Sequence, residues 1–249
     1  MEQRRQWYLY LTVFAAGMTT LGIELTASRL LGTVFGTSNI VWANIIGLIL
    51  VYLTAGYFLG GRLADRSPHA TTFYRLAAWG AFTAGMIPLV ARPVLRLAAQ
   101  AVLSINAVIL VGSFGVMLVL FSVPVTLLGT VSPFAIRLAI TGMDAAGRVS
   151  GRMYAISTVG SILGTFLPVL VLIPAIGTSL TFLALAGLLL IIALIGLARI
   201  DRRRALVLLW MPLLLIVLAV TLLRGPIRPP PLGATLIYED ESAYNYIQV

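Results

Sequence analysis

Long apolar runs separated by short polar segments follow one another along most of this 249-residue chain. A helix of about 20 apolar residues is long enough to cross the roughly 30 Å hydrocarbon core of a bilayer. The pattern predicts an all-α polytopic membrane protein with about seven transmembrane helices. The predicted spans are residues 7–31, 41–63, 73–90, 107–128, 153–176, 180–198 and 205–223.

The stretch from Val94 to Ile140 is too long for one crossing, because a single helix of that length would measure about 70 Å. We predict that Val94 to Ser104 is an amphipathic segment at the membrane surface. The fourth span, which contains Pro124, is expected to end near Gly129. The alternative is two spans in this stretch, which would bring the tail to the same side of the membrane as the amino terminus.

Composition supports a membrane protein and excludes a water-soluble globule. Apolar residues make up 60% of the chain and charged residues only 10%, with a mean hydropathy of +1.03, whereas soluble domains have about 25% charged residues. The net charge of +9 comes from 17 basic and 8 acidic residues, and every basic residue is Arg. Because the arginines lie in short groups between apolar runs, membrane orientation explains them and we expect no nucleic-acid partner.

The arginine distribution predicts which side each loop faces, because cytoplasmic loops carry an excess of Arg and Lys. Seven spans with a cytoplasmic amino terminus place 12 arginines inside and 4 outside, with Arg29 in or near the first span. We therefore expect a multi-pass protein of the cell membrane whose tail lies outside. The inside set is Arg4, Arg5, Arg62, Arg66, Arg75, Arg137, Arg148, Arg152, Arg199, Arg202, Arg203 and Arg204, and the outside set is Arg92, Arg96, Arg224 and Arg228.

The composition changes abruptly after the last apolar run, which divides the chain into three parts. Residues 1–224 form the transmembrane domain, residues 225–234 a Pro-rich linker, and residues 235–249 the start of a β domain. Tyr244 to Val249 is β-prone, and the acidic cluster before it predicts a turn. A lone hairpin cannot bury a core, so we expect this soluble domain to be incomplete in the chain.

Glu24 is the only acidic residue that we place inside an apolar run. A carboxylate at membrane depth is costly, which makes Glu24 a candidate substrate or proton site, with Arg29 as its expected partner. The alternative is a structural ion pair that orients the first helix near the outer interface.

Small residues at four-residue spacing predict close contact between helices, because they leave no bulky side chain between the axes. Gly160 and Gly164 form one such pair, and Gly56 and Gly60 another. Packing within the bundle is the preferred interpretation, and a dimer interface is the alternative. The chain has no Cys and its single His stands alone, so we expect no metal site.

The segment from Gly60 to Arg66, between the second and third spans, resembles a loop of the major facilitator superfamily. In that family a Gly is followed by an Asp and a basic residue, here Gly61, Asp65 and Arg66. The resemblance implies that Gly61 permits close packing and that Asp65 pairs at the cytoplasmic end of a helix in a gating role. An ordinary Asp-Arg pair that ends a helix explains the same residues.

The tail and the apolar part of the chain each resemble part of a known family. Glu241 to Val249 looks like the opening strand of the spermidine synthases, which are polyamine aminopropyltransferases. The apolar part resembles the amino-terminal facilitator-like region of membrane-bound spermidine synthase-like proteins. The residues that carry this second resemblance are Glu24 with Ser28 to Gly32, Gly60 to Arg66, Pro124 to Gly129, and Gly151 to Ala155 with Gly160 and Gly164.

This resemblance implies an activity that the chain does not contain by itself. Tyr244 and Asn245 correspond to residues near the aminopropyl-donor site, although the synthases commonly have Gln where Asn245 stands. The Gly-rich nucleoside loop, the acid that holds the donor ribose and the catalytic Asp belong downstream of Val249. We therefore expect no catalytic residue and no cofactor in this chain, and no aminopropyl transfer by it alone.

Three functions follow as hypotheses. The chain would anchor, and could feed or drain, a spermidine synthase-like domain that is missing from it. Alternatively, it would be a facilitator-like carrier of a small solute without catalytic activity. As a structural subunit it would bind a separately encoded synthase domain through the strand from Tyr244 to Val249, in addition to its contact with the lipid bilayer.

Overall fold

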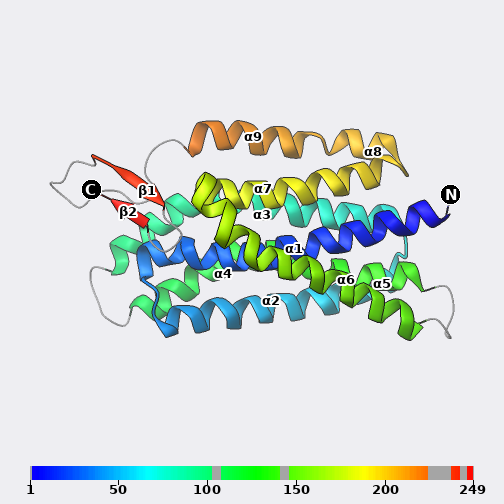
Figure 1. The fold of residues 1–249 in the computed structure, drawn as a ribbon, viewed down its shortest axis with the longest axis horizontal. Helices are drawn as coiled ribbons and strands as arrows, with labels where there is room; N and C mark the ends of the chain where they lie inside the picture. The colour runs from blue at the N-terminus through cyan, green and yellow to red at the C-terminus, as the bar shows by residue number, and fades with distance from the viewer. Residues whose placement is uncertain (1, 103–107, 141–145, 224–236, 242–245, 249) are drawn as a thin grey trace.

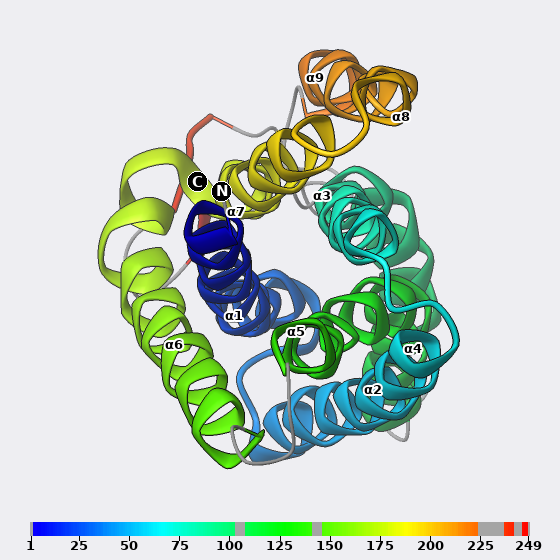
Figure 2. The ribbon, with the colours of Figure 1, turned by 90° about the vertical axis from the view of Figure 1, so that its right-hand side faces the viewer.

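The computed structural model describes residues 2–102, 108–140, 146–223, 237–241 and 246–248, most of which form helices along a common axis (Figure 1). Figure 2 shows α1 inside a ring of the other long helices. The elements are α1 (Glu2–Phe35), α2 (Asn39–Arg66), α3 (Ala70–Val102), α4 (Val108–Gly129), α5 (Val131–Ala139), α6 (Ala146–Leu167), the π-helical turn η2 (Pro168–Leu172), α7 (Ile173–Ala198), α8 (Arg202–Val207), α9 (Trp210–Leu222), β1 (Glu239–Glu241) and β2 (Tyr246–Gln248).

Six helical segments of the described chain are long and apolar enough to cross a membrane. The prediction of an all-α, multi-pass membrane protein is confirmed at this level. The segments are Gln6–Phe35, Asn39–Arg66, Ala70–Leu95, Val111–Ala139, Ala146–Ala198 and Arg202–Leu222.

The predicted fifth and sixth spans lie together in the 53-residue segment Ala146–Ala198. Its backbone leaves the helical conformation at Gly177, where φ is +79° and ψ is 167°. Positive φ is a conformation that glycine adopts without the steric cost of a Cβ. Figure 1 shows α6 and α7 running in opposite directions on the two sides of this break.

The third helix differs from its predicted end. The prediction ended this span at Val90 and placed Val94 to Ser104 at the membrane surface, whereas α3 continues through Pro88 and Pro93 to Val102. Proline is tolerated in membrane helices because neighbouring groups satisfy the freed backbone carbonyls. The buried face also continues past the prolines, because Ala91 is buried between them and Leu95 is buried after Pro93.

The fourth span also extends beyond its predicted end at Gly129. Only Thr130 separates α4 from α5, and its amide donates to the Leu127 carbonyl (3.1 Å). The amide of Phe134 then donates to the Thr130 carbonyl (3.3 Å), so the chain continues in the same direction as one 29-residue segment ending at Ala139. Pro133 falls in the first turn of α5, where a missing amide proton costs little.

The predicted seventh span, 205–223, is divided into α8 and α9. Asp201 caps α8 by accepting a hydrogen bond from the Arg204 amide (3.1 Å). Beyond α9, β1 pairs antiparallel with β2, with Asp240 opposite Ile247. The acidic cluster Glu239–Glu241 therefore forms a strand, where the sequence predicted a turn.

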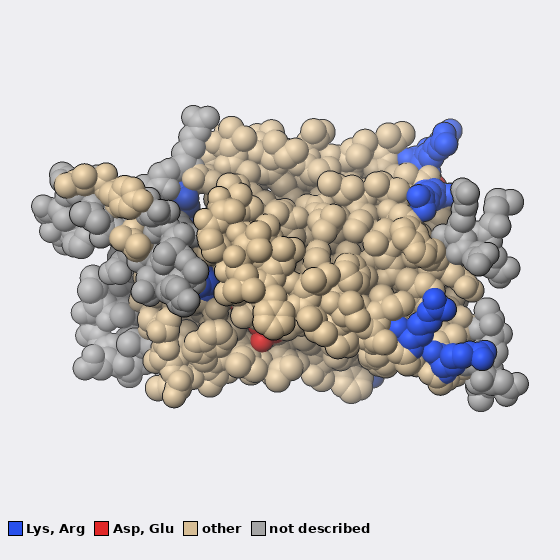
Figure 3. Space-filling view, in the orientation of Figure 1, with Lys and Arg blue, Asp and Glu red and all other residues tan. Residues whose placement is uncertain are grey.

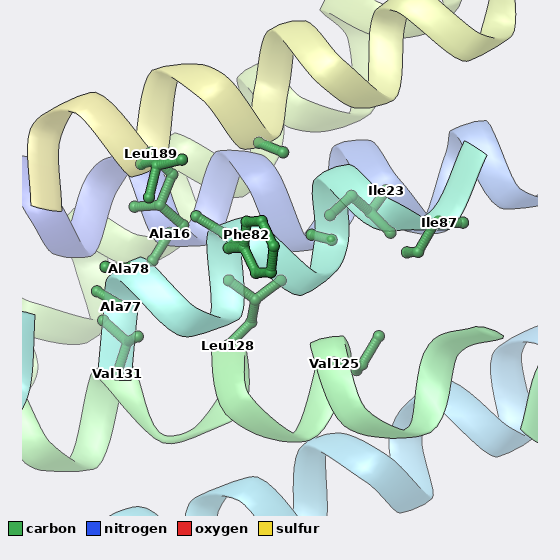
Figure 4. Close-up of a cluster of buried hydrophobic side chains, with 14 of the residues drawn as sticks. Ala16, Ile23, Ala77, Ala78, Phe82, Ile87, Val125, Leu128, Val131 and Leu189 are labelled. Carbon is green, nitrogen blue, oxygen red and sulfur yellow. The ribbon is translucent and has the colours of Figure 1, made fainter. Parts of the chain in front are cut away.

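The centre of the bundle is built from small and branched side chains of α1, α3, α4 and α7. Figure 4 shows Ala16 of α1 near Ala78 of α3 and Leu189 of α7, Ile23 of α1 near Ile87 of α3, and Leu128 of α4 beside Phe82 of α3. Polar side chains of α1 also bind α7, where Tyr8 Oη donates to the Ile192 carbonyl (2.9 Å) and Thr19 Oγ1 to the Leu185 carbonyl (3.2 Å). The first helix is therefore joined to α7 by polar as well as apolar contacts.

Candidate functional site

Asp65, at the carboxyl end of α2, forms an ion pair with Arg137, near the end of α5. The Arg137 Nε donates to the Asp65 Oδ1 over 3.1 Å. Both side chains are exposed, 48% for Arg137 and 73% for Asp65. The pair therefore joins two segments that are 72 residues apart without burying either charge.

The prediction made Gly61 the close-packing glycine before Asp65, whereas in the structure Gly60 has this role. A Cβ at Gly61 would have no neighbour within 4 Å among the described residues, so Gly61 does not pack closely against any of them. Gly60 does, because a Cβ there would lie 2.6 Å from the Thr130 carbonyl oxygen and 2.9 Å from Pro133 Cγ. The reason is angular: adjacent helical residues point about 100° apart, and only Gly60 faces α5.

Arg66 and the polar residues after it close α2 and begin α3. Arg66 is exposed in the last turn of α2, where a cation faces the negative end of the helix dipole. The Ser67 amide donates to the Leu63 carbonyl (2.9 Å), and the Ser67 hydroxyl lies 3.1 Å from Nδ1 of His69. This turn holds the Asp65 end of α2 in place.

Arg137 is the partner that the motif alone did not identify. The positive-inside rule predicts that Asp65 and Arg137 lie on one side of the membrane, but it gives no distance between them. Their contact follows from the packing of α2 on α5, which the small residue Gly60 permits.

Glu24 lies on α1 and is half-buried at the side of the bundle. Within the described residues, the ion pairs are Arg137 with Asp65 and Arg204 with Asp201, and neither includes Glu24. Arg29, the expected partner, is half-buried and engaged in another interaction. The five-residue separation explains the lack of a pair, because it turns the two side chains about 140° apart around the helix.

Gly160 and Gly164 lie where α6 packs on α1. A Cβ at Gly160 would collide with the Phe14 carbonyl oxygen, and one at Gly164 with the Met18 carbonyl oxygen. The hydroxyl of Ser161 donates across the same contact to the Gly17 carbonyl (3.2 Å). These two glycines are packing positions between helices of one chain.

Basic residues gather at the end of the bundle where α1 begins. Figure 3 shows most of the visible basic surface there and an almost uncharged surface along the middle. Two of these guanidinium groups lie over tyrosine rings of α1, Arg199 at 4.1 Å from Tyr8 and Arg152 at 4.6 Å from Tyr10. The amino-terminal turns of α1 are thus fixed by cation–π contacts to α6 and α7.

The remaining candidates do not form a chemical site within the described residues. Tyr244 and Asn245 lie outside them, as do residues 225–234 of the proposed linker. No group of three or more His, Asp or Glu side chains in the described part could hold a metal ion. The acidic groups that remain, Glu24 and Asp65, belong to different helices and are positioned by different contacts.

Comparison with family models, with curated proteins and with solved structures finds no match to this chain.

Proposed function

We propose that this chain is the integral membrane domain of a spermidine synthase-like protein and anchors an aminopropyltransferase-type domain. The observation that best supports this function is the change from apolar helices to β-strands at the end of the bundle. The apolar helices end at Leu222, and the described residues beyond them include an antiparallel pair of strands, β1 and β2. This pair is too small to bury a core, which supports completion by a further domain.

The same proposal includes seven crossings. The 53-residue segment Ala146–Ala198 is about 80 Å long if fully helical, far more than one crossing needs. Its break at Gly177 and the opposite directions of α6 and α7 support two crossings in this segment (Figure 1). With the other five segments, this gives an odd number and places the two ends of the chain on opposite sides.

A cytoplasmic amino terminus in the cell membrane is supported by the basic end of the bundle. The arginines at that end include Arg62, Arg66, Arg75, Arg137, Arg148, Arg152, Arg199, Arg202, Arg203 and Arg204. Asp65 and Asp201 pair with two of them. The excess of positive charge matches the bias of cytoplasmic loops, so the tail is assigned to the outside. A synthase domain there would use a donor or substrate other than the cytoplasmic one.

Thiol labelling tests this topology, because the chain contains no Cys. Single Ser242→Cys and Gly147→Cys variants would be treated with a membrane-impermeant maleimide in intact cells. We expect labelling of Ser242→Cys in intact cells and of Gly147→Cys only after lysis. Gly147 is a suitable control because it is exposed at the start of α6, and no described residue lies within 4 Å of a Cβ placed there. The reverse pattern, or labelling of both from outside, would reject seven spans with this orientation.

Strand pairing tests the anchoring function. In the described hairpin, Glu239 lies opposite Gln248 and Glu241 opposite Tyr246. The other edge of β2 supports pairing of Tyr244 to Val249 with a synthase domain. A soluble aminopropyltransferase domain without its first strand, co-expressed with this chain, should sediment with membranes. Ile247→Pro should release it and Ile247→Val should not, because only proline removes a strand amide. Sedimentation with membranes that is unchanged by Ile247→Pro would contradict the anchoring function.

A facilitator-like carrier is the second candidate, and the ion pair between Asp65 and Arg137 favours it. The contact joins the ends of α2 and α5 at the basic end of the bundle and is solvent-exposed. An exposed pair can open and close at small free-energy cost, as a gate requires. Substitution at Asp65 separates the two candidates and is described below.

A further inference from the structure

We propose that Glu24 is a proton-binding site: its side chain is held as a neutral carboxylic acid that is reachable from the lipid and can release its proton to a base. This site stands independently of any attached domain. It rests on the depth of Glu24, on its missing partners and on the groups around it.

The depth of Glu24 places it far from both ends of its span. Glu24 lies 18 residues after Gln6 and 11 residues before Phe35, the ends of the apolar segment of α1. At 1.5 Å per residue these separations are about 27 Å and about 16 Å. The second distance is about half the thickness of a hydrocarbon core. Figure 3 shows an acidic surface surrounded by uncharged surface in the middle of the bundle.

Glu24 makes no hydrogen bond or ion pair with any residue that the structure describes. Hydroxyl groups one turn away on the same helix do not supply donors. Thr20 Oγ1 donates to the Ala16 carbonyl (2.8 Å), and Ser28 Oγ donates to the Leu25 carbonyl (2.7 Å). A carboxylate needs donors, whereas a carboxylic acid needs only an acceptor, and a hydroxyl oxygen keeps acceptor capacity after it donates. The neutral acid therefore fits this environment and the anion does not.

The helices packed around α1 offer no charge at the level of Glu24. Near this level, on another side of α1, a Cβ at Gly22 would touch Gly164, Pro168 and Leu185, which are uncharged. α4, η2 and α7 contain no titratable side chain, and α6 contains none after Tyr154. The titratable or charged groups on the packed elements are Arg148, Arg152 and Tyr154 on α6, Tyr52, Tyr57, Arg62, Asp65 and Arg66 on α2, Tyr74, Arg75, Arg92 and Arg96 on α3, and Arg137 on α5.

Among these groups, Arg92 and Tyr52 lie well inside their helices and have other environments. Arg92 donates from Nη1 to the Leu222 carbonyl (3.0 Å) and thus faces α9. Tyr52 of α2 is buried, and its hydroxyl has no partner among the described residues. An unionised tyrosine adds no charge. When Glu24 loses its proton, the O–H bond breaks, the electron pair stays on the carboxylate, and water or an amine takes the proton.

A hydrophobic carbodiimide tests the site, because it partitions into lipid and reacts with protonated carboxyl groups. The purified chain in phospholipid vesicles would be treated with dicyclohexylcarbodiimide, digested and mapped by mass spectrometry. We expect one adduct in the membrane-spanning part, at Glu24, that decreases as the pH is raised. Its loss in Glu24→Gln and persistence in Glu24→Asp and in Asp201→Asn would identify the carboxyl.

Three results would contradict the proposal that Glu24 is a proton-binding site. Absence of the adduct from folded wild-type chain at mildly acidic pH would show that Glu24 is ionised or unreachable. Faster labelling by a water-soluble carbodiimide would show access from water rather than from lipid. Labelling that is independent of pH would show that no proton is exchanged. Wild-type peptide mapping alone decides these outcomes, so they do not depend on the folding of Glu24→Gln.

Discussion

The first and last long helices of this protein are attached to the bundle in different ways. In the most apolar 18-residue stretch of α1, 61% is buried inside the protein. In the corresponding stretch of the segment that contains α9, only 22% is buried. Both are apolar enough to cross a membrane. The difference shows that hydropathy does not decide attachment here, because lipid tails are as apolar as the leucines that face them.

Close backbone contact holds α1 against α6. Gly160 and Gly164 leave space for the Phe14 and Met18 carbonyls, and Gly17 leaves space for Ser157. Dispersion contacts and the Ser161 hydrogen bond then act along the whole contact.

A few side chains hold α9 instead. At its start, the Trp210 ring lies 5.1 Å from Phe82 and 6.0 Å from Trp79, centroid to centroid. At its end, the Arg92 guanidinium donates to the Leu222 and Leu223 carbonyls, each over 3.0 Å. Because the last carbonyls of a helix have no intrahelical donor, this contact acts as a cap supplied by α3.

The largest effect is expected from replacing Gly160 by Leu. The added side chain would collide with backbone of α1, which cannot rotate away, so the helices must separate. We expect a loss of at least about 3 kcal/mol, the upper end of overpacking costs. Thermal inactivation in detergent would measure it. Gly151→Ala on the same helix is the control, because a Cβ there meets no atom of the described part of the chain within 4 Å. Equal stability of the two variants would contradict the close contact.

A smaller effect is expected from Arg92→Met. This change removes the two hydrogen bonds to the end of α9 and leaves the rest of the bundle intact, so we expect a loss of about 2 kcal/mol. Arg92→Lys should recover only part of it, because an ammonium lacks the planar fork that reaches both carbonyls. Thermal unfolding followed by Trp fluorescence would report the change. Unaltered stability of Arg92→Met would show that the aromatic contacts suffice.

The smallest effect on stability is expected from Asp65→Asn. Exposed ion pairs contribute less than about 1 kcal/mol, and both partners here are exposed. The variant therefore separates stability from transport. In a facilitator-like carrier, solute uptake should fall while the unfolding temperature stays near that of the wild type. The charge exchange Asp65→Arg with Arg137→Asp should restore uptake. Uptake that is unaffected by Asp65→Asn would remove the gating role.

Several features could be predicted from the sequence because they depend on local properties. Apolar runs located the membrane helices, and Gly160 with Gly164 indicated close packing. The predicted end of the third span at Val90 was wrong, because α3 continues through Pro93 with a face that is buried as far as Leu95. In the 53-residue segment, the interruption that the sequence predicted between residues 176 and 180 coincides with the break at Gly177.

The sequence by itself determined that this protein lies in a bilayer, because the free energy of placing a helix in lipid depends on that helix alone. It also identified Glu24 as a residue that lipid does not easily accept. Only the tertiary structure decided what each candidate touches: Arg137 meets Asp65, Gly60 rather than Gly61 packs on α5, and Glu24 is not paired with Arg29. These outcomes depend on which helix faces which, and in lipid that choice is made by small residues and polar contacts between segments far apart in the chain.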